Sequence, residues 1–224
     1  MDRDEAKRQA ARAALELLPE AGVVGLGSGS TAQIFIDGVG ELVKAGRKLS
    51  GVPTSEASRR QAEALGIPLL DDSGPWAIDM CVDGADEVSE SLDLIKGGGG
   101  AHTREKIVNE ASRVNVIVVD DSKLSTRLGE KWPVPVEVLP FGHLSTVAAL
   151  GHFGKVELRK KAGAPWMSDA GNYLYDVFAG GSEDPAALEA GLLGVPGVVE
   201  TGLFVARANL VLVAGPHGLR KLAP

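Results

Sequence analysis

The sequence predicts an α/β protein in which a parallel-sheet domain carries an inserted, smaller α+β domain. Three observations predict this fold class. Short apolar strands alternate with helical segments up to about residue 130, the order that builds a parallel sheet with helices on both faces. After residue 130 the order of elements changes, and residues 210–214 (LVLVA) then look like one more strand of the first sheet. We therefore expect a first domain of residues 1–130 plus 206–224, and a second domain of residues 131–205.

In the first domain, apolar residues at helical spacing predict helices, and short apolar runs predict strands. The N-terminal helix is expected to stop at Pro19. The run VNVIVV is apolar or strand-forming throughout, which is typical of a strand buried on both faces of a parallel sheet. In chain order we expect a helix over 3–18, a strand at the start of VVGLGSGSTA, helices over 31–45 and 55–65, strands over 67–70 and 77–82, a helix from about 102, and a strand over 114–119.

The second domain reads as a different arrangement. Its expected elements, in chain order, are a strand over 134–140, a helix over 141–153, strands over 155–160 and 173–178, a helix over 185–193 and a strand over 198–204. The order β-α-β-β-α-β is that of the ferredoxin-like, or split βαβ, arrangement. The chain is thus expected to leave the first domain, build a small α+β domain and return.

Composition limits the classes of function. The chain has 224 residues, of which 44% are hydrophobic and 24% are charged, and this is ordinary for a globular protein. The formal net charge of −7 argues against a nucleic-acid partner, because such proteins usually carry a basic surface. It leaves an anionic small molecule possible, since a local pocket can be positive on an acidic protein. The single cysteine, Cys81, excludes an internal disulfide framework and indicates a buried apolar filler.

No apolar run approaches the roughly 18 residues that a membrane span needs. The N-terminal segment MDRDEAKRQAARAALELL is charged and has helical spacing, without the apolar region of a signal peptide. We therefore expect a cytoplasmic protein with no membrane partner.

The first glycine-rich turn, residues 25–31 (GLGSGST), directly follows a strand and opens a helix. Glycines let successive N–H groups point to one side, and the helix N-terminus adds a positive dipole end. The hydroxyls of Ser28, Ser30 and Thr31 add donors, so the turn is a candidate phosphate site. The alternative is a tight turn in which Ser30 or Thr31 only caps the helix.

A dinucleotide is disfavoured at this turn. The G-x-G-x-x-G pattern that starts at Gly25 requires glycine where Ser30 stands. A ribose-binding acid should end the next strand, but Glu56 falls inside a predicted turn or helix. A P-loop is excluded as well, because no Gly-Lys-Ser/Thr follows the glycines.

A second glycine-rich segment is the run of residues 97–100, which follows Lys96 and precedes Glu105. Four consecutive glycines cost chain entropy, and they suit a place where backbone approaches a ligand. The alternatives are a solvated surface position for Lys96 and, for Glu105, a first-turn glutamate that the helix dipole favours.

Two further polar segments follow strands. The turn DGADE, residues 83–87, suggests a metal site or acid–base chemistry, or else Asp83 and Asp86 cap a following helix. No histidine lies near it in the sequence, so a metal site lacks partners. The segment DDSK, residues 120–123, carries Lys123, and its alternative is a helix start capped by Ser122.

Because each of these four segments follows a strand, we expect them to meet at one edge of the parallel sheet. They supply phosphate donors, two lysines and carboxylates, but neither a redox-cofactor motif nor a nucleophile–histidine pair. This set suits proton transfer next to a carbonyl on a small phosphorylated substrate, with a carboxylate as the base and a lysine to stabilise the enediolate oxygen.

Six motifs occur in a specific order between about Lys7 and Gly218. They are GSGSTA, DGADE, KGGGG-A-x-TREKI, DDSK, PVEV-x-P and PGVVETGLF. Together they resemble the A-type family of ribose-5-phosphate isomerases. The resemblance implies interconversion of D-ribose 5-phosphate and D-ribulose 5-phosphate in the pentose phosphate pathway, with neither a metal nor an organic cofactor. It also implies a Rossmann-like domain with a smaller α+β domain, assembled as a homodimer or homotetramer.

The resemblance also implies roles for individual residues. Glu105 matches the family's catalytic base, which moves the proton between C1 and C2. Asp83, Asp86 and Lys96 match residues that assist ring opening and stabilise the enediolate. The matching substrate-binding positions are Ser28, Gly29, Ser30, Thr31, Gly84, Ala85, Gly97, Gly98, Gly99 and Lys123, with Lys7 as a further position that reaches the phosphate.

The sequence departs from the family pattern at two positions. Gly100 stands where alanine is expected, and His102 stands where an apolar residue is common. Two other functions remain open: a sugar-phosphate sensor without catalysis, and a CoA-transferase-like enzyme that uses a glutamate as nucleophile. Fold alone cannot decide among them.

Overall fold

The computed structural model describes residues 2–224, whose contacts divide the chain into two units. Unit 1 contains the chain up to Ala85, Arg104–Lys123 and Arg207–Pro224, and unit 2 contains Asp86–Thr103 and Leu124–Ala206. The boundaries expected from the sequence differ from this division at residues 86–103, 124–130 and 206, which they assign to the first domain.

A short antiparallel sheet explains this difference. It has the order β13-β5-β4, in which β5 (Leu94–Ile95) pairs with both β4 (Glu87–Val88) and β13 (Leu203–Phe204). Each of these strands is two residues long, and β13 lies far from β4 and β5 in the chain, so their pairing does not follow from a local apolar pattern. Their pairing ties residues 87–95 to the end of unit 2.

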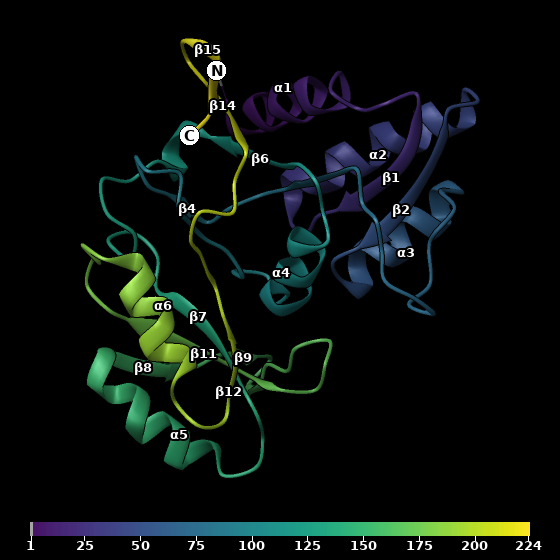
Figure 1. The fold of residues 1–224 in the computed structure, drawn as a ribbon. Helices are drawn as coiled ribbons and strands as arrows, with labels where there is room; N and C mark the ends of the chain where they lie inside the picture. The colour runs from purple at the N-terminus through teal and green to yellow at the C-terminus, as the bar shows by residue number, and fades with distance from the viewer. Residues whose placement is uncertain (1) are drawn as a thin grey trace. The chain divides into compact units, whose positions relative to one another are not determined.

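The main sheet of unit 1 has six strands in the order β15-β14-β6-β3-β1-β2. Figure 1 labels β15, β14, β6, β1 and β2 of this sheet. All neighbours are parallel except β15, which is antiparallel to β14. The predicted return of the chain is confirmed, because β14 pairs with β6. The strands are β1 (Ala21–Leu26), β2 (Lys48–Pro53), β3 (Met80–Asp83), β6 (Asn115–Asp120), β14 (Leu210–Gly215) and β15 (Gly218–Leu222).

The strand order reverses between β1 and β3. From β1 the chain builds β2 on one side, whereas β6 and β14 are added on the other side, beyond β3. Open α/β sheets bind ligands at the carboxyl ends of the strands beside such a reversal. The turns that follow β1 and β3 therefore lie at the favoured place for a ligand.

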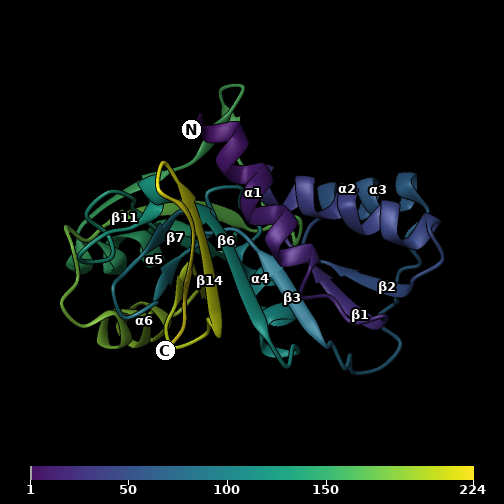
Figure 2. The ribbon, with the colours of Figure 1, turned by 90° about the horizontal axis from the view of Figure 1, so that it is seen from above.

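Different helices pack on the two faces of this sheet. The helices α1 (Arg3–Leu15), α2 (Ser30–Lys44) and α3 (Glu56–Leu65) lie on one side of the strands, and α4 (His102–Glu110) lies on the other (Figure 2). Side chains alternate between the faces of a strand. Accordingly Val82 joins the core with α1–α3, and its neighbour Cys81 is buried beside Val108 of α4.

Unit 2 contains the expected ferredoxin-like arrangement. Its four-stranded antiparallel sheet has the order β12-β7-β11-β8, and two helices connect the strands in the sequence β-α-β-β-α-β. A separate apolar core fills it, built around the buried strand β7. The elements are β7 (Val134–Val138), α5 (His143–Leu150), β8 (Lys155–Leu158), β11 (Tyr173–Phe178), α6 (Pro185–Leu193) and β12 (Val198–Thr201).

Several details depart from the sequence-based expectations. The strand expected over 67–70 is only an isolated bridge between Leu69 and Gly51. The strand expected over 198–204 is split between β12 and β13, which belong to different sheets. The sequence does not predict the hairpin of β9 (Lys160–Lys161) and β10 (Ala164–Pro165) or the short 3-10 helix η1 (Asp121–Lys123). The last residues of the helix expected over 141–153 form a separate 3-10 helix, η2 (Gly151–Phe153).

None of the helices in residues 2–224 is both long and apolar enough to cross a membrane.

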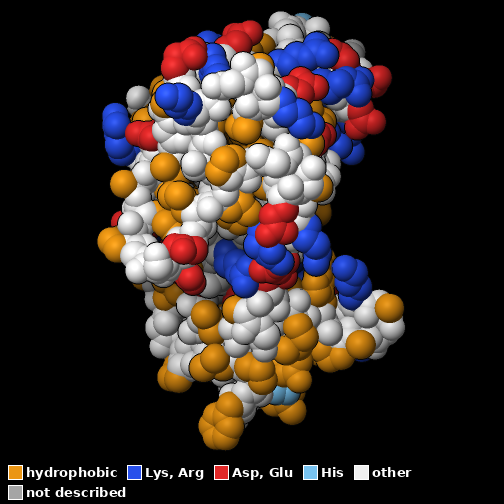
Figure 3. All heavy atoms as spheres, turned by 90° about the vertical axis from the view of Figure 1, so that its right-hand side faces the viewer, with side chains coloured by type: hydrophobic (Ala, Val, Ile, Leu, Met, Phe, Trp, Pro, Cys, Tyr) orange, Lys and Arg blue, Asp and Glu red, His pale blue; other side chains and the backbone are white. Residues whose placement is uncertain are grey.

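On the face drawn in Figure 3, Lys and Arg side chains alternate with Asp and Glu, and they do not gather into one basic area. The ion pairs of Arg59 with Glu56 and Glu63 on α3 are examples of this mixing in unit 1.

Candidate active site

The turns after β1 and β3 are joined by hydrogen bonds in unit 1. Oδ1 of Asp83 accepts the backbone N–H of Ser28 over 2.8 Å and that of Gly84 over 2.7 Å. Asp83 is only 2% exposed. A Cβ on Gly27 would lie 2.3 Å from the same oxygen, so glycine is required for the two turns to approach so closely. The phosphate-type turn and the acidic turn thus form one structure.

A group of hydroxyls lies behind this junction. Oγ of Ser28 is 2.8 Å from Oγ1 of Thr54 and 2.8 Å from Oγ of Ser55. Ser58 donates to the carbonyl of Gly27 over 2.6 Å. None of the motifs in the sequence points to Thr54, Ser55 or Ser58, although the first two directly follow β2, the neighbour of β1. Their position after a strand is the signal that could have found them.

The start of α2 is not capped by a side chain. Its N-cap is Gly29, and among the described residues no side chain makes the capping hydrogen bond. The interpretation of Ser30 or Thr31 as a simple cap is therefore wrong. Gly29 and Ser30 are exposed, and Thr31 is half-buried. The N-terminus of α2 thus keeps its positive dipole end and first N–H groups at the carboxyl end of β1, the arrangement that binds anions.

Glu105 lies in the first turn of α4 and is 4% exposed. The residue before it, Arg104, forms an ion pair with Glu56 of α3 over 3.0 Å. Hydrogen bonds from Arg59, and then from Arg104, hold the pKa of Glu56 below its ordinary value of 4.5. Glu56 therefore serves as an ion-pair partner of Arg59 and Arg104. Glu105 is left as the buried carboxylate of this turn.

Lys123 ends η1 at the carboxyl end of β6 and is half-buried. Asp120 accepts hydrogen bonds from both the N–H and the hydroxyl of Ser122, and Arg3 of α1 donates to the same hydroxyl over 3.1 Å. Ser122 is thus part of a turn organised by Asp120, and the alternative of a helix capped by Ser122 is wrong. Lys7, on α1, lies 3.4 Å from Asp4.

Asp86 and Lys96 belong to unit 2. Oδ2 of Asp86 accepts the N–H of Gly98 over 2.6 Å. β4 directly follows Asp86, so the interpretation of Asp83 and Asp86 as caps of a following helix is wrong. Lys96 is 3% exposed and its Nζ lies 5.4 Å from the ring centroid of Phe204, which excludes the solvated surface position.

The glycine run follows β5, which is part of the antiparallel sheet of unit 2. The expectation that all four polar segments follow strands of one parallel sheet is therefore wrong for residues 97–100. It holds for the segments after β1, β3 and β6, which are neighbours in the unit 1 sheet.

Three of the four glycines in the run are required by the fold. Gly97 and Gly100 have positive φ angles of 100° and 79°, and a Cβ on Gly98 would lie 2.7 Å from the Asp86 carboxylate. Gly99 has no such constraint: its φ is outside the positive region, and a Cβ on it would meet no described atom within 4 Å. Gly99 is exposed, so neither backbone conformation nor packing in the fold requires a glycine at this position.

The two departures from the family pattern have structural reasons. An alanine at position 100 would be strained at this φ and would place its Cβ 2.6 Å from Leu174. Nε2 of the fully buried His102 lies 3.3 Å from the carbonyl oxygen of Glu200. Because a carbonyl only accepts, this nitrogen carries the proton, and His102 ties the start of α4 to β12.

Within residues 2–224, no group of three or more His, Cys, Asp and Glu side chains is arranged to hold a metal ion. The carboxylates of the acidic turn are instead used on backbone N–H groups: Asp83 on Ser28 and Gly84, and Asp86 on Gly98.

Residues 50–218 match the family model of ribose 5-phosphate isomerase A, also called phosphoriboisomerase A. The chain belongs to the ribose 5-phosphate isomerase A family. It is therefore an isomerase enzyme, and family membership supports ribose 5-phosphate isomerisation.

Relatives of this family match over nearly the whole chain. Ribose-5-phosphate isomerase A of Gloeobacter violaceus is 47% identical, with 100% of this chain and 98% of the relative covered. The protein of the same name from Deinococcus radiodurans is 41% identical, with 99% of each covered.

Solved structures of the family share the fold. A D-ribose-5-phosphate isomerase in complex with phospho-erythronic acid superposes with a TM-score of 0.96 at 39% identity, with 100% of both chains covered. Ribose 5-phosphate isomerase A from Methanocaldococcus jannaschii gives a TM-score of 0.92 at 38% identity, with 99% of both chains covered.

Proposed function

We propose that the chain interconverts D-ribose 5-phosphate and D-ribulose 5-phosphate through an enediolate, with Glu105 as the base. The observation that carries the proposal is the junction of Ser28 with Asp83, 2.8 Å apart, at the reversal of the strand order. It joins an uncapped helix N-terminus, suited to a phosphate, to a buried carboxylate suited to acid–base chemistry.

The proposed chemistry is a proton transfer between neighbouring carbons. Glu105 removes the proton from C2 of the open-chain aldose, and the electron pair of that bond forms the C1=C2 double bond while the aldehyde oxygen becomes negative. Glu105 then returns the proton to C1. The proton of the 2-hydroxyl moves to the negative O1, so that C2 becomes the ketone and C1 carries the hydroxyl. The Lys96 ammonium stabilises the negative oxygen, as a fixed charge does in a site with little water.

Other residues have supporting roles in the proposal. Asp83 and Asp86 assist opening of the sugar ring. The phosphate is bound at the N-terminus of α2, with Lys123 as a cationic partner, and no metal or organic cofactor takes part. The substrate-binding positions are Ser28–Thr31, Gly84, Ala85, Gly97–Gly99 and Lys123.

The family resemblance extends the proposal to the cellular setting. We propose that the enzyme works in the cytoplasm, in the non-oxidative branch of the pentose phosphate pathway, as a homodimer or homotetramer. Its partner is the sugar phosphate, without nucleic acid or membrane.

The test is conversion of ribose 5-phosphate to ribulose 5-phosphate by the wild-type chain, with and without EDTA. We expect the same rate in both, and competitive inhibition by phospho-erythronic acid, whose planar carboxylate resembles an enediolate in shape and charge. Binding of ribose 5-phosphate without turnover would instead support a sensor. A thioester formed from acyl-CoA and trapped with hydroxylamine would support a CoA-transferase-like enzyme.

A further inference from the structure

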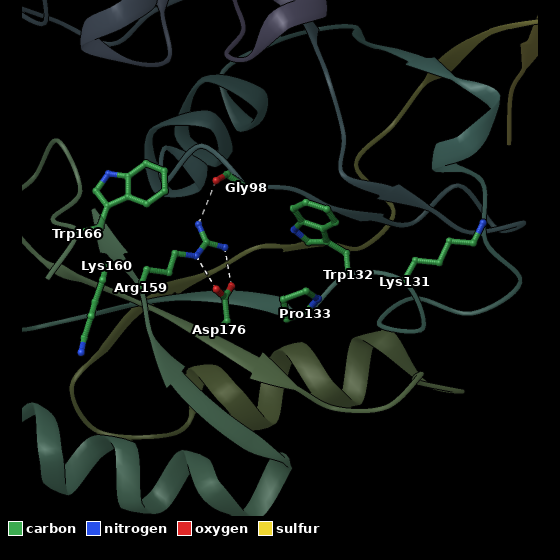
Figure 4. Close-up of a pocket in the computed structure, with 8 residues that line it drawn as sticks. All are labelled: Gly98, Lys131, Trp132, Pro133, Arg159, Lys160, Trp166 and Asp176. Carbon is green, nitrogen blue, oxygen red and sulfur yellow. Dashed lines mark hydrogen bonds and ion pairs between the residues drawn. The ribbon is translucent and has the colours of Figure 1, made fainter. Parts of the chain in front are cut away.

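Arg159, the residue after β8, holds the backbone of the glycine run in unit 2 (Figure 4). Its Nη1 donates to the carbonyl of Gly97 over 2.6 Å and lies 3.3 Å from that of Gly98. Its side chain is only 8% exposed. The buried guanidinium thus lies against two carbonyl groups of a loop whose glycines allow many backbone conformations.

Asp176 of β11 fixes the orientation of this guanidinium. Its two carboxylate oxygens accept Nε and Nη2 of Arg159 over 2.8 and 2.6 Å, and this two-pronged geometry leaves the third nitrogen, Nη1, aimed at the glycine run. The ring of Trp166 lies 5.9 Å from the guanidinium carbon. A lysine could not replace this arrangement, because an ammonium lacks the planar fork.

The peptide group between Gly97 and Gly98 is held at both ends. Its carbonyl accepts from Arg159, and its N–H donates to Asp86 over 2.6 Å. In a trans peptide the carbonyl and the N–H point in opposite directions, and the described chain has no cis peptide. Arg159 and Asp86 therefore fix the rotation of this peptide group between them.

The next peptide group follows from the same geometry. The carbonyl of Gly98 also faces Arg159, so the N–H of Gly99 in that peptide group points away from Arg159. Gly99 is the glycine whose presence the fold does not explain. A flip of either peptide group would break charge-assisted hydrogen bonds, so the direction of the Gly99 N–H depends on Arg159.

We propose that Arg159, oriented by Asp176, is a positioning residue that sets the peptide orientation of Gly97–Gly99 for binding of the sugar phosphate. This rests on the proposed function, in which these glycines bind substrate. Arg159 does not touch the substrate in this proposal. It acts through the backbone that does.

The structure also offers a direct test of the positioning role. A cavity of about 390 Å³ is lined by Gly98, Arg159, Asp176 and Trp166, together with residues of the 131–133 segment. Removal of the Arg159 side chain would leave space next to Asp176 that opens onto this cavity. Free guanidinium ions can enter such a space and replace the lost group.

The experiment compares Arg159→Ala, Arg159→Lys and Asp176→Asn with Arg127→Ala, a matched control in unit 2. Arg127 forms ion pairs with Glu130 and Glu183 over 3.0 and 3.2 Å. We expect KM for ribose 5-phosphate to rise roughly tenfold to a hundredfold in Arg159→Ala, the effect of one lost charge-assisted hydrogen bond. Arg159→Lys should show a similar rise in KM, because an ammonium lacks the planar fork. Asp176→Asn should show a smaller rise in KM.

Guanidinium, added below the concentration that unfolds the protein, should lower the KM of Arg159→Ala and leave that of Arg127→Ala unchanged. A folded Arg159→Ala variant with wild-type KM would overturn the positioning role. So would a rise in KM that guanidinium does not reverse and that follows the loss of stability in urea. If Arg159→Ala does not fold, a wild-type KM in Asp176→Asn overturns it. Absence of turnover in the wild type would instead count against the proposed function.

Discussion

The backbone N–H of Ser28 donates to the carboxylate of Asp83 over 2.8 Å, although 55 residues separate them in the chain. The bond joins the ends of two adjacent parallel strands, where the strand order reverses. One oxygen of Asp83 therefore holds two turns together, and the carboxylate has both a structural and a proposed chemical role.

Substitution of Asp83 separates these roles. Asp83→Ala leaves the N–H groups of Ser28 and Gly84 without their acceptor, so the free energy of unfolding should fall by about 2 kcal/mol or more. Asp83→Asn keeps an accepting oxygen and should cost less than about 1 kcal/mol, while turnover falls in both variants. Urea unfolding and steady-state kinetics measure the two effects. An alanine variant as stable as the wild type would show that the bond does not hold the turns.

Substitution of Gly99 tests whether the substrate approaches the glycine run. Gly99→Ala meets no steric obstacle in the fold, so stability should stay the same or rise slightly, as for alanine at a compatible backbone conformation. If substrate approaches here, the added methyl should raise KM by roughly tenfold, the effect of overpacking a site. The matched control is Gly98→Ala, whose Cβ would lie 2.7 Å from the Asp86 carboxylate. That variant should lose stability, and an unchanged KM in Gly99→Ala would place the substrate elsewhere.

The ion pair of Glu56 predicts a pH dependence of stability. Hydrogen bonds from Arg59 and Arg104 lower the pKa of Glu56 in the folded state. A group with a lowered folded pKa stabilises above its unfolded pKa, and this contribution disappears as the pH falls through the folded value. Wild type should therefore be more stable than Glu56→Gln at pH 7, and the difference should shrink below about pH 4. Urea titrations at several pH values measure it, and a difference independent of pH would mean that the pair acts only by packing.

Much of the fold follows from local sequence patterns. The parallel strands and the β-α-β-β-α-β order were expected because each element is marked by its own apolar spacing, as in VNVIVV of β6. The three-stranded sheet could not be predicted in this way. β5 and β13 are each two residues long, and the separation of β13 from β12 depends on its pairing with β5, more than a hundred residues away in the chain. The unit boundary at Ala85 depends on this pairing and was missed for the same reason.

In the candidate site, too, sequence patterns predict some of the residues, and only the fold reveals others. Ser28, Asp83 and Lys123 could be found because each follows an apolar strand and carries a side chain suited to phosphate or proton chemistry. Ser58, inside α3, donates to the carbonyl of Gly27 only because the tertiary fold brings them together. Arg159 is harder still to find, since it falls within the strand expected over 155–160, where no motif marks it. Its bonds to Gly97 and Asp176 become visible only when unit 2 is assembled.

We propose that Glu105 moves the proton between C1 and C2. The most direct measurement is turnover of ribose 5-phosphate by Glu105→Gln, together with its affinity for phospho-erythronic acid. Glu110→Gln is the control, because Glu110 lies on the same helix and pairs with Arg207. We predict that kcat of Glu105→Gln falls by roughly 10²–10⁴-fold or more, the range for loss of a general base, while affinity for the inhibitor changes only a few fold. Wild-type turnover in Glu105→Gln would contradict the account.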